Sequence, residues 1–243
     1  MMNRFVLVVI CVIPLFSAAQ FSDSLTHFTR LSLSGNINQT NGSTNSFMNN
    51  EARYSIKKTR KVLNTYAAWV YGRQVNRVTN NDFMATLDFN LYNKQGNFYE
   101  WGLANYTTSL SLHINNQLQT GVGVAYNFVN NTNAWLNISN GLLYETSSIA
   151  LSDSVNNKYQ TIRNSFRLSY RFVFWKLLTV NGTNFLQNSL SNGDDYIIRS
   201  NNSAGIKLNK WLSFLTTVSY NRFKRTGTEN FLFTYGLAAE KYF

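Results

Sequence analysis

The sequence predicts an all-β fold, a single antiparallel up-and-down transmembrane β-barrel of about twelve strands. Three observations predict it. Segments of alternating apolar and polar residues recur after residue 27, the turns between them are alternately tight and long, and the last segment ends on an aromatic residue. Successive strand side chains point to opposite faces, so each segment has an apolar face and a polar face. Such segments suit a wall between lipid and a polar lumen.

The N-terminus has the features of a cleaved export signal. Arg4 precedes an apolar run from Phe5 to Phe16, and Ser17, Ala18 and Ala19 supply a small-residue cleavage site. The alternative, a membrane anchor, needs a longer run of about 20 apolar residues. We therefore expect residues 1–19 to be a signal peptide, 20–27 a short N-terminal lead and 28–243 a barrel in the Gram-negative outer membrane.

Composition excludes several classes of protein. The single cysteine, Cys11, and the single proline, Pro14, both lie in the predicted signal peptide. The mature chain is then expected to have no disulfide, no thiolate nucleophile and no cysteine-ligated metal site. No apolar run after residue 20 approaches the roughly 18 residues of a transmembrane helix. No cofactor is expected.

The chain is strongly basic. Its formal net charge is +11, and it becomes +10 after removal of residues 1–19, since Arg4 is the one charged residue there. A basic balance is typical of nucleic-acid binding, but an exported protein rarely meets nucleic acid. We expect this charge to face outer-membrane lipid and lipopolysaccharide, or to line the lumen. The oligomeric state stays open between a monomer and an unknown oligomer.

The strands follow one another with little intervening sequence. The alternation is clearest between residues 83 and 92, where Phe83, Leu87 and Phe89 oppose Asp88 and Asn90. The predicted strands cover residues 30–38, 48–57, 62–74, 83–92, 98–107, 118–129, 134–145, 159–174, 177–187, 196–208, 211–222 and 230–243. Because boundaries drawn from sequence shift by a few residues, about ten or fourteen strands remain alternatives.

The connections alternate in length. Tight turns are predicted at residues 57–61, 93–97, 130–133, 174–176 and 209–210, and longer loops at 40–45, 75–82, 108–117, 146–158, 189–195 and 223–229. Outer-membrane barrels have short periplasmic turns and long extracellular loops. With periplasmic termini, every longer loop here lies outside.

The final segment is expected to close the barrel. Phe231, Phe233, Tyr235 and Leu237 share one face, and the chain ends at Phe243. An unpaired strand edge in lipid leaves backbone groups unsatisfied, so the last strand must pair with the first. The chain end also resembles the C-terminal signal read by the barrel-assembly machinery, and the resemblance implies that Phe243, Tyr235 and Leu237 form an assembly signal.

Three stretches resemble the family of domain of unknown function 481. They are LSLSGNINQTNGSTN at 31–45, TGVGVAYNF at 120–128 and NISNGLLYE at 137–145. The family often has an arginine shortly before the Gly-x-Gly strand, where this chain has Asn115, Asn116 and Gln117. The resemblance implies an outer-membrane β-barrel, of a kind sometimes labelled salt-induced, and no settled activity.

Sites for chemistry are weak in this sequence. Gly121 and Gly123 lack the third glycine and the helix of a nucleotide-binding loop, so we expect them to permit bending or close packing of a lumen side chain. The stretch NISNG resembles the His-x-Ser-Asn-Gly strand of outer-membrane lipases and deacylases, but Asn137 stands where the base would activate Ser139. Asp194 and Asp195 are interpreted as a solvated turn. We expect that the protein is not an enzyme.

The strongest cluster of charge is on the predicted strand 159–174. Arg163, Arg167 and Arg171 share one face, and this face must point inward, because an arginine facing lipid near the midplane costs about 2–4 kcal/mol. The inward or ambiguous acids available to pair with them are Glu51, Asp88, Glu100 and Glu145. The lumen-lining candidates are Arg163, Arg167, Arg171, Glu51, Arg53 and Asp88.

Two functions follow from this lumen, and a third is weaker. A salt-bridged lumen filled by side chains predicts a structural or envelope-stress barrel, since a barrel of this size need not be open. The same arginines, left unpaired, predict a small diffusion channel for anionic or polar solutes. An outer-membrane acyl hydrolase is the weaker alternative.

Overall fold

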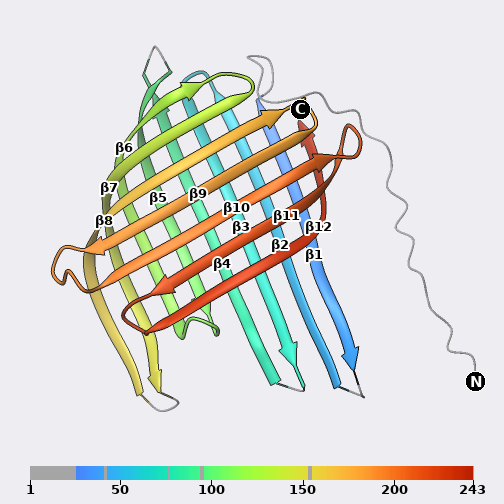
Figure 1. Ribbon diagram of the computed structural model, residues 1–243. Coiled ribbons are helices and arrows are strands. Elements are labelled where there is room, and N and C mark those ends of the chain that lie inside the picture. Colours follow the sequence, from blue (N-terminus) through green and yellow to red (C-terminus); the bar gives the residue numbers. More distant parts are fainter. Residues whose placement is uncertain (1–25, 41–42, 76, 94–95, 153–154, 243) are drawn as a thin grey trace, which may run out of the picture.

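The computed structural model describes residues 26–40, 43–75, 77–93, 96–152 and 155–242 (Figure 1). The predicted signal peptide, nearly all of the short lead and Phe243 lie outside these residues. Within them the chain forms twelve strands and no helix. The strands are β1 (His27–Thr40), β2 (Ser43–Lys58), β3 (Lys61–Gln74), β4 (Arg77–Tyr92), β5 (Phe98–Ser109), β6 (Ile114–Asn130), β7 (Ala134–Ser152), β8 (Val155–Phe174), β9 (Leu178–Ser189), β10 (Tyr196–Lys207), β11 (Leu212–Phe223) and β12 (Thr228–Tyr242).

The strands form one closed antiparallel barrel, which confirms the predicted fold. Each strand pairs with its neighbours in sequence, and β1 closes the barrel against β12 in a register that runs from Phe28 opposite Tyr242 to Ser34 opposite Gly236. Figure 1 shows the end of β12 beside the start of β1. The closing role predicted for the last strand is therefore confirmed. No helix in the described part of the chain is long and apolar enough to cross a membrane.

The apolar face of each strand points out of the barrel. On β12, Phe231, Phe233, Tyr235 and Leu237 are exposed, whereas Thr234 between them is buried. On β4, Phe89 is exposed and the neighbouring Asn90 is buried. A water-soluble protein rarely leaves so large an apolar surface uncovered. The alternation read from the sequence is therefore the alternation between the outer surface and the lumen.

Four of the six predicted longer loops, 40–45, 75–82, 108–117 and 146–158, are wrong in length, because most of their described residues extend the strands, whereas residues 190–195 and 224–227 lie between strands as predicted. The predicted loop 146–158 is largely strand: β7 continues to Ser152 and β8 begins at Val155. Its polar residues still pair across the hairpin, as Ser147 does with Tyr159. The alternation of the two ends holds, since the hairpins β1–β2, β3–β4 and β7–β8 all project at one end (Figure 1). We call this the outer end. The opposite end, where β1 begins and β12 ends, is the inner end.

A tryptophan fills the lumen beside the Gly-x-Gly strand. Trp101 of β5 is buried and packs with Tyr99, Ala125 and Leu143. A Cβ atom added at Gly123 of β6, or at Gly141 of β7, would collide with the Trp101 indole. The close packing predicted for the Gly-x-Gly strand is therefore confirmed at Gly123.

Replacing Gly123 by alanine is expected to weaken the barrel. The added methyl group has no space, and overpacking of this kind costs about 1–3 kcal/mol of unfolding free energy. Gly102→Ala is the matched control, because nothing lies within 4 Å of a Cβ atom there. The denaturant midpoint of each refolded variant is measured by titration, with mobility on gels without boiling as the signal for the folded barrel. Equal midpoints for the two variants would contradict the packing.

Candidate functional site

The arginines of β8 lie on the inward face of the barrel. Arg163 is 0% exposed, while its neighbour Ile162 is 50% exposed. Arg167 is opposite Ser139 and Arg171 is opposite Trp135 in the register with β7. The structure thus orients this strand as its alternation predicts, with charge inside and apolar side chains outside.

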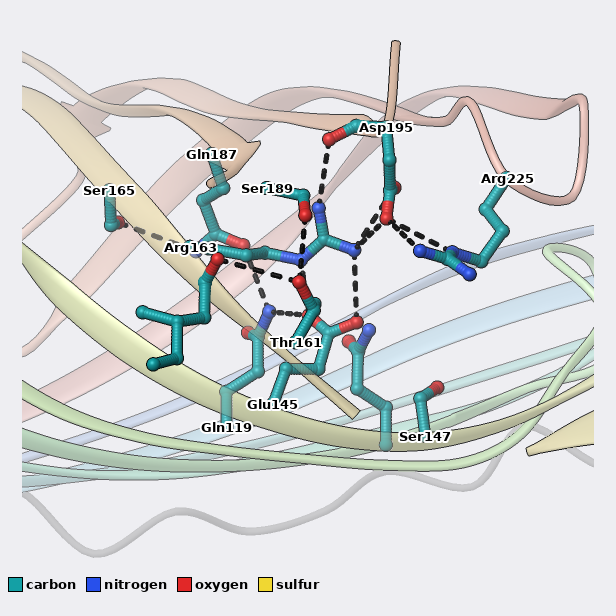
Figure 2. Close-up of polar contacts among 12 residues, drawn as sticks. Gln119, Glu145, Ser147, Thr161, Arg163, Ser165, Gln187, Ser189, Asp195 and Arg225 are labelled. Carbon is teal, nitrogen blue, oxygen red and sulfur yellow. Dashed lines mark hydrogen bonds and ion pairs between the residues drawn. The ribbon is translucent and has the colours of Figure 1, made fainter. Parts of the chain in front are cut away.

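Arg163 bridges two buried carboxylates (Figure 2). Its Nε donates to Glu145 Oε2 at 2.7 Å and its Nη2 to Glu145 Oε1 at 3.1 Å. Nη2 also donates to both carboxylate oxygens of Asp195 at 3.0 Å, and Nη1 donates to the Asp195 backbone oxygen at 3.1 Å. A guanidinium held by two carboxylates in a dry interior is stable only because nearly every donor is used.

Neighbouring polar side chains hold Glu145 in place. The Tyr159 hydroxyl donates to its Oε1 at 2.7 Å, and Gln119 Nε2 donates to its Oε2 at 2.6 Å. Gln119 Nε2 also donates to Gln187 Oε1 at 2.9 Å. The network therefore joins the neighbouring strands β6, β7, β8 and β9 on the lumen side of the wall. Such a network is rigid because each member fixes the next.

Asp195 joins two of the outer connections. It lies between β9 and β10, and Arg225 lies between β11 and β12. Arg225 Nε donates to Asp195 Oδ2 at 3.0 Å, and its Nη2 pairs with the same oxygen. The Arg225 guanidinium stacks over the Tyr159 ring at 3.8 Å from its centroid. The prediction of a solvated turn is wrong for Asp195, which is 3% exposed, although Asp194 is exposed.

The connection between β5 and β6 covers the lumen at the same end. Leu112 is buried there against Ile114, Ile149, Ile197 and Phe223. Two hydrogen bonds reach it from β12 on the far side of the barrel: Thr228 Oγ1 donates to the Leu112 backbone oxygen at 3.1 Å, and Asn230 Nδ2 donates to Ser111 Oγ at 2.9 Å. We call Leu112 and its four apolar neighbours the cap.

Asp82 of β4 anchors the connection that carries Leu112. Its Oδ2 accepts from Ser111 Oγ at 2.7 Å, and its Oδ1 accepts from the Ser111 backbone N–H at 3.1 Å and from Ser109 Oγ at 2.8 Å. A carboxylate that accepts several hydrogen bonds holds a short loop firmly. The cap and the ion pairs of Arg163 therefore both lie in the lumen at its outer end.

Arg167 spans the lumen nearer the inner end. Its Nη1 lies 3.4 Å from Asp88 Oδ2 on β4, and its Nε donates to Ser139 Oγ at 3.0 Å. Its guanidinium also lies over the Trp101 ring, 5.6 Å from the centroid. Asn64 Nδ2 donates to the other oxygen of Asp88 at 3.1 Å. Arg167 and Asp88 thus form one cross-lumen pair, separate from the Arg163 cluster.

The remaining predicted lumen residues lie elsewhere. Glu51 on β2 accepts from Asn49 at 3.2 Å, and Arg53 is opposite Tyr66 in the register with β3. These strands are on the opposite side of the barrel from β8. Glu100, which the sequence left ambiguous, is exposed. The six candidates therefore do not form a single site.

The structure also places charged residues that sequence reasoning missed. Arg225, Asp195 and Arg199 all contribute to the outer half of the lumen. Only the position of Arg199 could have been predicted. Because an arginine that faces lipid is unfavourable, an arginine within the predicted strand 196–208 is expected to point into the lumen, as Arg163 does. The alternation itself does not show on which face of the strand Arg199 lies, because the two consecutive apolar residues Ile197 and Ile198 precede it.

Among the residues that the structure describes, no histidine or carboxylate is hydrogen-bonded to Ser139. Its Oγ accepts from Arg167, and it is 2% exposed. Asn137 accepts from the Tyr99 hydroxyl at 3.1 Å and donates to Asn127 Oδ1 at 2.8 Å. Among the described residues no three His, Cys, Asp or Glu side chains gather as metal ligands would.

Replacing Arg163 by methionine is expected to destabilise the barrel strongly. It leaves Glu145 and Asp195 buried without their cation, and breaking a buried pair costs about 3–5 kcal/mol. Arg222→Met is the control, because the Arg222–Glu229 pair is exposed and should contribute little. Denaturant midpoints of the refolded proteins compare them, and an unchanged midpoint for Arg163→Met would refute the structural role of the cluster.

Solved structures share this fold. The COG4313 outer membrane channel from Pseudomonas putida F1 is 11% identical with a TM-score of 0.52, over 96% of this chain and 100% of that chain. The NanC porin is 8% identical with a TM-score of 0.52, over 88% of this chain and 98% of that chain. At these identities the likeness shows the fold alone. No curated protein matches the sequence.

The family profile described as "Protein of unknown function, DUF481" matches residues 31–231. The match spans β1 to β12 and includes the three stretches in which the resemblance was noted. It covers well over half of the chain and confirms that resemblance. The chain belongs to this family of proteins of unknown function.

Proposed function

We propose that this protein is a structural or envelope-stress barrel of the outer membrane, sealed at its outer end by its own side chains. The observation that carries this proposal is the buried Arg163, whose guanidinium is held between Glu145 and Asp195. The cap, with Leu112 inside the barrel, supports the same conclusion. A solute passing the outer end would have to displace both.

The proposed surroundings follow from the surface and the chain ends. The apolar outer face suits lipid, and the basic balance suits lipopolysaccharide at the outer rim. The predicted N-terminal export signal and the predicted C-terminal assembly signal favour export followed by insertion through the barrel-assembly machinery. The protein acts as a monomer or in an oligomer of unknown size.

A small diffusion channel for anionic or polar solutes is the second candidate. The observation that favours it is the uneven filling of the lumen. The inward-facing side chains of β5 to β8 are mostly buried, whereas Asn201 on β10 and Arg53 on β2 are exposed. Space of this kind conducts only if the outer closure opens, and opening breaks the Asp195 ion pairs. The sealed barrel is therefore the better-supported function.

An acyl hydrolase is the least supported function. The hydroxyl of Ser139 receives a hydrogen bond from an arginine, and a guanidinium cannot take its proton. A nucleophilic serine needs a general base within hydrogen-bond reach. We therefore propose that the protein is not an enzyme.

Conductance across a planar bilayer tests the seal. We expect the wild-type protein to show no steady open level. Asp195→Asn combined with Leu112→Ala should conduct, because it removes the carboxylate shared by Arg163 and Arg225 and the centre of the cap. Asp194→Asn combined with Leu110→Ala is the matched control, since both side chains are exposed neighbours. The seal would be rejected if the wild-type protein showed a steady open level equal to that of the variant with Asp195→Asn and Leu112→Ala.

Deleting Phe243 tests the assembly signal. We expect the shortened chain to be depleted from the outer membrane, because the terminal aromatic residue is lost. Phe243→Tyr keeps an aromatic terminus and should insert normally. Membrane fractionation and gel mobility without boiling report insertion. Normal insertion of the deletion variant would place the signal elsewhere.

A further inference from the structure

Arg199 is a lumen cation bound by amide oxygens. It lies on β10, two residues along the strand from Ile197 of the cap. Its Nη2 donates to Gln117 Oε1 at 2.6 Å, and its Nη1 lies 3.4 Å from Gln119 Oε1. The guanidinium also lies over the Phe223 ring, 5.2 Å from the centroid. Within the described residues, these contacts include no carboxylate.

The neighbouring acids are already in use. Arg163 and Arg225 are paired with Glu145 and Asp195. Asp82, a further carboxylate at the outer end, accepts from Asn80, Ser109 and Ser111. Glu145 is held by Arg163, Tyr159 and Gln119, and Asp195 by Arg163 and Arg225. Among the described residues none of these carboxylates contacts Arg199, whose guanidinium meets amide oxygens and the Phe223 ring instead. A charge in an interior of low dielectric favours a counter-ion.

Gln117 adds a hydrogen-bond donor that the described residues do not use. Its side chain is 0% exposed, and its Nε2 donates to no acceptor among them. The amide orientation follows from Arg199, because the reverse orientation would set N–H groups against N–H groups. An unpaired buried donor is rare in a folded protein. Here it belongs to the same amide that Arg199 contacts.

The lumen has space on the inner side of Arg199. Arg199 itself is half-buried, and Asn201, the next inward-facing residue of β10, is exposed. On the side toward the outer end, Ile197 and Phe223 of the cap are buried. A ligand would therefore reach Arg199 from the inner end.

We propose that Arg199 and Gln117 form a binding site for an anionic oxygen group, a carboxylate or phosphate of a small soluble molecule that enters from the inner end. The guanidinium supplies charge and a planar pair of donors, which match such groups. The free donor of Gln117 supplies the second point of contact. The site goes beyond the sealing role and does not depend on it, because binding needs no passage across the barrel.

Equilibrium dialysis of the full chain in detergent tests the site. The probes are radiolabelled acetate and, separately, radiolabelled inorganic phosphate. We expect the wild-type protein to bind at least one of them, and the probe that binds identifies the group. Arg199→Met should weaken binding at least about tenfold, the equivalent of one lost charge-assisted hydrogen bond. Arg222→Met, an exposed arginine on β11, is the matched control and should bind as the wild type does.

Gln117→Glu provides an independent arm. It places a carboxylate against Arg199, so it should abolish binding of both probes while raising the denaturant midpoint, because the new carboxylate pairs with the guanidinium. Gel mobility without boiling shows that each variant is folded. If Arg199→Met does not fold, the binding of the two probes to folded Gln117→Glu tests the proposal by itself. The proposal is overturned if the wild type binds neither probe, or if folded Arg199→Met or Gln117→Glu binds as the wild type does.

Discussion

The structure depends on the burial of one guanidinium between two carboxylates inside the barrel. Arg163 cannot face lipid, and it cannot lie in a dry lumen without partners. Glu145 meets it from the neighbouring strand, and Asp195 meets it from the connection between β9 and β10. Because Arg225 binds the same carboxylate, the ion pairs also fix the connection between β11 and β12. One buried cation therefore ties together the strands and the outer connections.

Apolar side chains fill further parts of the lumen beside the ion pairs. The cap places Leu112 among side chains from β6, β7, β10 and β11. Nearer the inner end, Trp101 fills the space that Gly123 and Gly141 leave open. Both clusters lie in the lumen, since the outward faces are left for lipid. The barrel is thus filled most densely against β5 to β8, and Arg199 borders the less densely filled side.

Much of this arrangement could be predicted from the sequence, and its limits are physical. The alternation in β8 and β12 fixes which side chains face lipid, so the inward direction of Arg163 and the closing role of β12 were both predictable. The lengths of the outer hairpins were not predictable, because a run of polar residues is typical of a loop, whereas here most of these residues pair as strands. The partners of Arg163 were only partly visible. Glu145 is near in sequence, whereas Asp195 and Arg225 come from later connections that pairing of β8 with β9 and folding of the following strands bring to it.

The seal at the outer end can be measured most directly by the accessibility of engineered cysteines in intact cells. In a Cys11→Ser background, Ser165→Cys places a thiol at a buried position beneath the Arg163 cluster, and Ser191→Cys places one at an exposed position above it. A membrane-impermeant thiol reagent added from outside should label Ser191→Cys and leave Ser165→Cys unlabelled. Equal labelling of the two variants would show that the outer end is open.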